Sequence, residues 1–100
     1  MKIIWSEKAG ETLQKRIDYL KIHWTEKEIR QFTKRVFDYL ETLANEPLIA
    51  RPTYKTKNTH IGVIIKQVSV IYRVKPGKNV IELVAFIDNR QNPKKTKQLL

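Results

Sequence analysis

Only a few side chains of this sequence have a type and a spacing that could do chemistry. His60 is the one candidate for a base that titrates near neutral pH. Tyr54 could stack a nucleobase or act beside Lys55. Arg73 and Arg90 are the candidate cations, because a guanidinium can stabilise the negative charge that develops on a reacting phosphate. These five residues are the candidates for acid–base chemistry on a phosphodiester.

Each of these candidates also has a plain structural interpretation. His60 could be an ordinary polar residue at the start of a strand, and Arg73 could pair across two strands with Glu82. His23 lies next to Trp24 at a helical turn and gives little indication of a site. With two distant histidines and no cysteine, we expect no metal site, and no other cofactor is indicated.

A connection between the two halves of the chain, NEPLIARPTYKTKN over residues 45–58, has no clear periodicity. Connections of this length in small domains are often functional or contain a short irregular helix. Arg51, Lys55 and Lys57 here suit phosphate contacts, and Tyr54 suits base stacking. A solvated loop is the equal alternative.

The charge of the chain is strongly asymmetric. Residues 1–50 hold nine basic and eight acidic side chains, whereas residues 51–100 hold eleven basic and two acidic ones, for +10 overall. Such a basic half predicts a positive face that attracts polyanions or an acidic protein. The alternative is a charge that serves only solubility.

Size and composition narrow the class of protein. One hundred residues with 41% hydrophobic side chains predict a single domain over 1–100 with one modest core. No apolar stretch is long enough to span a membrane, and the first residues do not continue into a signal-peptide core. We therefore expect a soluble cytoplasmic protein.

The near-neutral half predicts two helices. Ser6 can cap the first helix, and Thr25 with Glu28 forms a capping box for the second, which should stop before Pro47. Apolar residues recur at helical spacing along one face of each. The short turn before Thr25 predicts an antiparallel helical hairpin.

The basic half predicts strands over residues 60–66, 68–75 and 79–88, with a fourth candidate at residues 2–6. The expected fold is α+β: an N-terminal strand, an antiparallel helical hairpin, then a three-stranded antiparallel meander. All four strands would form one antiparallel sheet with the hairpin on its apolar face.

A turn centred on Gly77 and Lys78 sets the register of the last two strands. The expected pairs are Tyr72–Leu83, Val70–Ala85 and Val74–Ile81 on one face, and Arg73–Glu82, Ile71–Val84 and Ser69–Phe86 on the other. The second face would then carry a patch of Ile71, Val84 and Phe86 beside Arg73. That patch predicts either a protein-binding groove or a surface covered by the C-terminal tail.

The sequence FIDNRQNPKK ends the last strand. Asp88 can pair with Arg90 and fix its guanidinium, and Pro93 would turn Lys94 and Lys95 across the same edge. We therefore expect these cations, with Arg73 and the apolar patch, to bind a partner.

In the order of its elements the chain resembles the RelE/ParE superfamily of toxins from bacterial type II toxin–antitoxin modules. The most specific features are the SEKA helix start, the segment Ile71-Tyr72-Arg73-Val74, and Arg90 beyond the last strand. The resemblance implies a helical hairpin on a small antiparallel sheet. It also implies growth inhibition and neutralisation by an acidic antitoxin in a hetero-oligomer.

The superfamily divides by target. RelE-like members cleave mRNA on the ribosome without metal, and ParE-like members inhibit DNA gyrase. RelE-like enzymes carry two lysines on the second strand and an arginine early in the third. Here the second strand has no lysine before Lys66, and Ser69 stands at the arginine's place. Gyrase inhibition is therefore favoured over the ribosome-dependent endonuclease, with a non-catalytic basic nucleic-acid-binding module as a further alternative.

Overall fold

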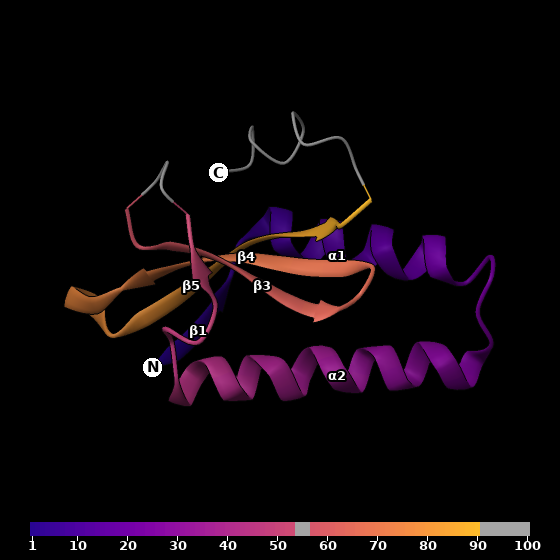
Figure 1. Cartoon of the computed structure of the whole chain (residues 1–100), viewed down its shortest axis with the longest axis horizontal. Helices are drawn as coiled ribbons and strands as arrows, with labels where there is room; N and C mark the ends of the chain where they lie inside the picture. Colours follow the sequence, from indigo (N-terminus) through magenta and orange to yellow (C-terminus); the bar gives the residue numbers. More distant parts are fainter. Residues whose placement is uncertain (54–56, 91–100) are drawn as a thin grey trace.

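The computed structural model describes residues 1–53 and 57–90. Its elements are β1 (Lys2–Trp5), α1 (Glu7–Leu20), α2 (Glu26–Asn45), β2 (Arg51–Pro52), β3 (Thr59–Ile65), β4 (Val68–Lys75), a 3₁₀ turn (Pro76–Lys78) and β5 (Val80–Asp88). The predicted α+β order of strand, helical hairpin and meander is confirmed, with the short β2 in addition (Figure 1).

Both helix starts follow from their capping residues. The Ser6 hydroxyl accepts the Ala9 N–H at 3.0 Å, and Thr25 and Glu28 form the predicted capping box. These bonds satisfy N–H groups that the first helical turn leaves without partners. In the part of the chain that the structure describes, no helix is both long enough and apolar enough to span a bilayer.

The sheet is mixed, with strand order β1-β5-β4-β3-β2. The prediction of a wholly antiparallel sheet is wrong, because β1 pairs in parallel with β5, from Lys2 beside Val80 to Trp5 beside Leu83. A tight turn forces only consecutive strands to be antiparallel. β1 is separated from β5 along the chain by two helices and three strands, so no such constraint applies to this pair.

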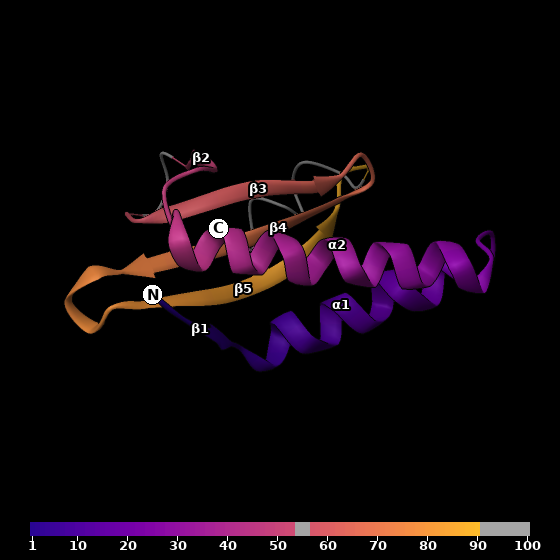
Figure 2. The same ribbon diagram turned by 90° about the horizontal axis from the view of Figure 1, so that it is seen from below.

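Where β1 ends, α1 continues along the same edge of β5 (Figure 2). The Ser6 N–H donates to the Leu83 carbonyl at 3.1 Å, and the Ser6 hydroxyl donates to the Val84 carbonyl at 2.9 Å. The Phe86 N–H then donates to the Thr12 hydroxyl at 2.8 Å. Ser6 and Thr12 thus satisfy backbone groups of β5 that a neighbouring strand would otherwise pair.

The predicted register of β4 and β5 is correct near the turn and wrong beyond it. Opposite Tyr72 stands Leu83, as expected, and the pairs Arg73–Glu82 and Val74–Ile81 are also confirmed. An irregularity between Ile71 and Tyr72 then shifts the ladder by one residue. The observed pairs are Val70–Phe86, Ile71–Ala85 and Ser69–Ile87, in place of the predicted Val70–Ala85, Ile71–Val84 and Ser69–Phe86.

The core lies between α2, α1 and one face of the sheet. α2 contributes Phe32, Val36, Leu40 and Leu43, all at most 5% exposed. The strands contribute Val70, Tyr72, Ile81, Leu83 and Phe86, among others. The register shift brings Phe86 to this face, where its ring lies 5.5 Å from the ring of Trp5.

Candidate functional site

A fixed arginine lies at the end of β5. Arg90 Nε lies 3.2 Å from Asp88 Oδ1, and Arg90 Nη2 lies 3.3 Å from Asp88 Oδ2. The backbone N–H of Arg90 also donates to Asp88 Oδ1, at 2.8 Å. The predicted Asp88–Arg90 pair is thus present. Because two guanidinium nitrogens face one carboxylate, the direction of the Arg90 side chain is set although the side chain is 57% exposed.

α1 supplies the other side of this cluster. The Arg90 guanidinium lies over the Tyr19 ring, 5.4 Å from its centre, and Arg16 Nη1 contacts Asp88 Oδ2 at 3.2 Å. The Tyr19 ring meets His23 edge-on at 5.9 Å. We call Arg16, Tyr19, Asp88 and Arg90 the arginine cluster.

The two arginines of the cluster lower the pKa of the Asp88 carboxyl. Partial burial would raise the pKa of Asp88, but the hydrogen bonds and charge of Arg90, together with the charge of Arg16, outweigh it and hold the pKa below its usual value. The hydrogen bond and the charge of Asp88 raise the pKa of Arg90 in turn. The result is a permanently charged, oriented cation at the protein surface, suited to a carboxylate or a phosphate.

Arg73 lies on the other side of the sheet and belongs to a separate network. Its Nε donates to Thr59 Oγ1 at 3.3 Å, and its Nη1 lies 4.0 Å from Glu82 Oε1. Lys75 contacts the same Glu82 at 3.4 Å. The cross-strand pair suggested by the sequence is therefore present but long, and the Thr59 hydroxyl is the closer partner of Arg73.

His60 is buried and committed to structural contacts. Its ring stacks on the Tyr72 ring, with centres 5.2 Å apart and planes inclined by 11°. Nδ1 lies 3.1 Å from the Ala50 carbonyl, which can only accept, so Nδ1 carries the proton and donates. The Tyr72 hydroxyl donates to the Pro47 carbonyl at 2.9 Å, and burial is the main cause that raises the Tyr72 pKa to about 12. Together these two side chains tie the α2–β3 connection to the sheet.

The described catalytic candidates do not come together. His60 and Arg73 pair with Tyr72 and Thr59 respectively, so their side chains point to opposite faces of the sheet. Arg90 follows the end of β5, where Asp88 pairs with Val68 of β4. Val68 is five positions from Arg73 along β4, a separation of roughly 17 Å at the rise of a strand. Tyr54 and Lys55 lie outside the described residues.

The predicted phosphate-binding residues are placed only in part. Arg51 and Lys57 are both exposed, on β2 and just before β3. Arg51 stands opposite Ile61 in the two-residue ladder between β2 and β3. Lys55, the third predicted member, is outside the part of the chain that the structure describes.

The predicted apolar patch of Ile71, Val84 and Phe86 does not exist as one surface. Phe86 packs in the core on the helix side, and Ile71 is fully buried on the opposite face. The one-residue shift of the β4–β5 ladder near Val84 places Phe86 and Ile71 on opposite faces of the sheet. Lys94 and Lys95, which we expected beside this patch, lie beyond the last described residue.

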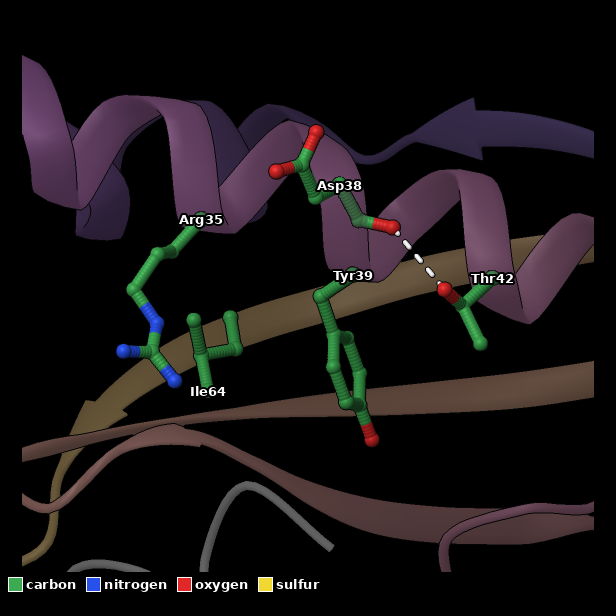
Figure 3. Close-up of a pocket in the computed structure, with 5 residues that line it drawn as sticks. All are labelled: Arg35, Asp38, Tyr39, Thr42 and Ile64. Carbon is green, nitrogen blue, oxygen red and sulfur yellow. Dashed lines mark hydrogen bonds between the residues drawn. The ribbon is translucent and has the colours of Figure 1, made fainter.

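Sequence reasoning missed two features of α2. One is an open pocket of about 400 Å³ lined by Arg35, Asp38, Tyr39, Thr42 and Ile64 (Figure 3). The other is the exposed aromatic pair Trp5 and Phe37, whose rings lie 6.3 Å apart. The sequence signal for the pocket is the helical spacing of Arg35, Tyr39 and Thr42, which places these three polar side chains on one face of α2 beside its apolar stripe. No group of three or more His, Asp or Glu in the described chain is arranged to hold a metal ion.

Comparison with known proteins identifies the family. The model of the family described as "ParE toxin of type II toxin-antitoxin system, parDE" matches residues 3–93. The chain belongs to the ParE toxin family. Among curated protein sequences, none matches it.

Solved structures show that this ParE-family chain has a RelE-like fold. The isolated E. coli RelE toxin superimposes with a TM-score of 0.57 at 12% identity, over 99% of this chain and 98% of RelE. A RelE mutant in complex with an antitoxin RelBc peptide gives a TM-score of 0.52 at 11% identity, over 99% and 93% of the two chains. At such identities the likeness establishes the fold alone.

Proposed function

We propose that this toxin inhibits growth by binding DNA gyrase in the cytoplasm, and that an acidic antitoxin neutralises it. The observation that carries the proposal is the separation of the candidate catalytic groups. His60, Arg73 and Arg90 lie on different faces or at different ends of the sheet, so no two of them can act on one phosphate.

Phosphodiester cleavage without metal needs a base and cations around one reacting group. His60 is 7% exposed, stacked on Tyr72, and donates from Nδ1 to a backbone carbonyl. A ring held in this way cannot approach a 2′-hydroxyl of RNA. The Arg90 guanidinium, in contrast, is exposed and is oriented by Asp88, which suits binding.

The proposal of an antitoxin partner rests on charge and on the family. The second half of the chain carries eleven basic and two acidic residues, so an acidic partner would be attracted to it. The structurally similar RelE mutant was solved with an antitoxin peptide. Arg90, already oriented by Asp88, is the residue through which we expect the antitoxin or the target to bind.

Ribosome-dependent mRNA cleavage is the second candidate function, and the RelE-like fold favours it. It would need Tyr54 or Lys55, with Arg51 and Lys57 as phosphate contacts, to supply the chemistry that His60 cannot. A basic nucleic-acid-binding module without chemistry is the third candidate.

Two assays on the purified protein separate these functions. In a gyrase assay, supercoiling should fall or gyrase–DNA cleavage complexes should accumulate. In a translation reaction, mRNA in the ribosomal A site should stay intact. Codon-phased cuts that disappear in Lys55→Ala would reverse the assignment, and normal growth of cells that express the soluble protein would refute the toxin proposal.

A further inference from the structure

β1 is an edge strand, and within the part of the chain that the structure describes no strand lies on its outer side (Figure 2). The N–H groups of Lys2 and Ser6 donate to carbonyls on the β5 side, at 3.2 and 3.1 Å. Backbone groups of successive residues in a strand point alternately to its two sides, so those of Ile3 and Trp5 point away from β5. Both residues therefore offer an N–H and a carbonyl group to a further strand.

The two edges of the sheet differ in their protection against pairing with another chain. β2, at the far edge, consists of Arg51 and Pro52, and a charged residue and a proline are common means of blocking an exposed edge. β1 has the sequence KIIW and pairs with β5 in an unbroken register. Its Ile4 and Trp5 side chains are 42% and 37% exposed. An apolar edge strand that lacks such protection is suited to pairing with a further strand.

Exposed apolar side chains lie on both faces of the sheet at this edge. On the face that carries α2, the Trp5 ring lies 6.3 Å from the ring of Phe37, which is itself 55% exposed. On the opposite face Ile4 stands beside Glu82 of β5. A strand added beside β1 would therefore cover apolar surface on both faces, in addition to bonding the outward backbone groups.

The charge of this edge favours a second copy of the chain as the occupant. Residues 1–50 carry nine basic and eight acidic side chains, so the basic excess that would repel a second copy belongs to the other half of the sequence. Lys2 and Glu7 are exposed, and no ion pair involves either of them among the described side chains. If two copies pair antiparallel about Ile4, Lys2 of each copy comes beside Glu7 of the other. Opposite charges would then meet at both ends of the paired strands.

We propose that β1 pairs antiparallel with β1 of a second copy, about a two-fold axis at Ile4, so that the five-stranded sheets of the two copies join into one. In this register Ile3 stands opposite Trp5 of the other copy, and Ile4 stands opposite its own counterpart. Ile3 and Trp5 would exchange both N–H···O bonds, because the backbone groups of both residues point outward. The same surface serves both copies, so the assembly closes at a dimer.

A single cysteine tests this register, because the sequence contains none. Ile4→Cys would place two thiols in a non-hydrogen-bonded antiparallel pair, whose Cα atoms lie about 4.5 Å apart, within the range that a disulfide spans. Mild oxidation of the full chain should give a covalent dimer on a non-reducing gel, and a reducing agent should return the monomer. Val63→Cys, at an exposed apolar position of β3, is the matched control and should stay monomeric on the same gel.

Sedimentation equilibrium of the full chain measures the association itself. The mean mass should rise from that of a monomer toward that of a dimer between about 1 and 100 μM, as expected for a small interface. Ile4→Lys places two like charges opposite each other on the axis and removes apolar contact, so it should raise the dissociation constant about tenfold or more. Val63→Lys adds the same charge at another exposed strand position and should associate like wild type. The thermal midpoints of both variants, measured where wild type is monomeric, should stay close to that of wild type.

Three results would overturn the dimer and leave the gyrase and antitoxin proposals intact, because none of these measurements depends on toxicity. A wild-type chain that stays monomeric up to about 100 μM has no such interface. A dimer that persists in Ile4→Lys and gives no disulfide in Ile4→Cys uses another surface. A monomeric toxin that loses its complex with the protein of the neighbouring reading frame in Ile4→Lys, but not in Val63→Lys, assigns the β1 edge to that partner instead.

Discussion

Phe86 on β5 donates its backbone N–H to the side-chain hydroxyl of Thr12 on α1, at 2.8 Å. A helix side chain here takes the place of a strand partner, at the point where β1 has ended and α1 runs along the edge of β5. The same hydroxyl lies 2.6 Å from the Lys8 carbonyl, to which it donates. The bond therefore fixes α1 against the part of the sheet that leads to the arginine cluster.

Removing this hydroxyl should destabilise the fold. Thr12→Val keeps the shape of the side chain and leaves the Phe86 N–H without an acceptor, which costs about 1–3 kcal/mol of unfolding free energy. Thr12→Ser keeps the hydroxyl and should lose much less. Urea denaturation of the three proteins measures the difference, and equal stability of Thr12→Val and wild type would contradict the role of this bond.

The Asp88 carboxylate of the arginine cluster should make the free energy of unfolding depend on pH in the acid range. The pKa of Asp88 is lowered in the folded state, so the carboxylate stabilises the fold above its unfolded pKa of about 4. This stabilisation is lost as the pH falls below 4 and through the folded pKa. Wild type should exceed Asp88→Asn in stability at pH 7, and the two should converge at low pH.

Urea midpoints measured between pH 7 and pH 2 provide this test. Asp38→Asn is the matched control, because among the described residues the ion pair of the Asp38 carboxylate is a long 4.0 Å contact with Lys34, and both side chains are exposed. A gap between wild type and Asp88→Asn that stays constant with pH would show that the Asp88 charge does not contribute.

Arg90→Ala should separate function from stability. Arg90 is exposed and Asp88 keeps its contact with Arg16, so the thermal midpoint should hardly change. Toxicity, antitoxin affinity or both should fall, because the oriented guanidinium is lost. Arg30→Ala, an exposed arginine on α2, should keep both properties. Full toxicity with normal antitoxin binding in Arg90→Ala, or its unfolding, would refute the assigned role.

Gly62 should resist substitution because of Tyr39. A Cβ at position 62 would overlap the Tyr39 hydroxyl and lie 2.6 Å from its Cζ atom. Gly62→Ala should therefore cost about 1–3 kcal/mol as overpacking, and Tyr39→Ala should relieve part of that cost in a double-mutant cycle. A Cβ at position 10 would have no atom within 4 Å apart from its own chain neighbours and helix backbone, so Gly10→Ala should instead stabilise α1, by up to about 1 kcal/mol. Additive effects of the two substitutions in the cycle would contradict the proposed clash.

Local signals in the sequence were sufficient for the elements and for one contact of the site. The Ser6 cap, the Thr25–Glu28 capping box and the Asp88–Arg90 pair each involve residues at most three positions apart, and all three are present. Such contacts depend on the nearby backbone and little on the rest of the fold.

Tertiary contacts account for the errors. The register was correct from the turn to Tyr72–Leu83 and failed beyond it, where the Val84 carbonyl accepts the Ser6 hydroxyl and α1 docks on β5. That docking also places Tyr19 beneath Arg90, which no local pattern in the sequence indicates. The burial of His60 depends in the same way on Ala50, ten positions earlier in the chain.

The pairing of β1 with β5 also determines when this domain can fold. Lys2 pairs with Val80, and Thr12 bonds to Phe86, so the sheet partners of the first segments to be synthesised lie in the last strand. Contacts so distant along the chain slow folding, and none of them can form on a chain still lacking β5. A nascent chain that ends before Val80 has no strand to place beside β1. The toxin fold can therefore close only late in translation, after nearly the whole chain has been made.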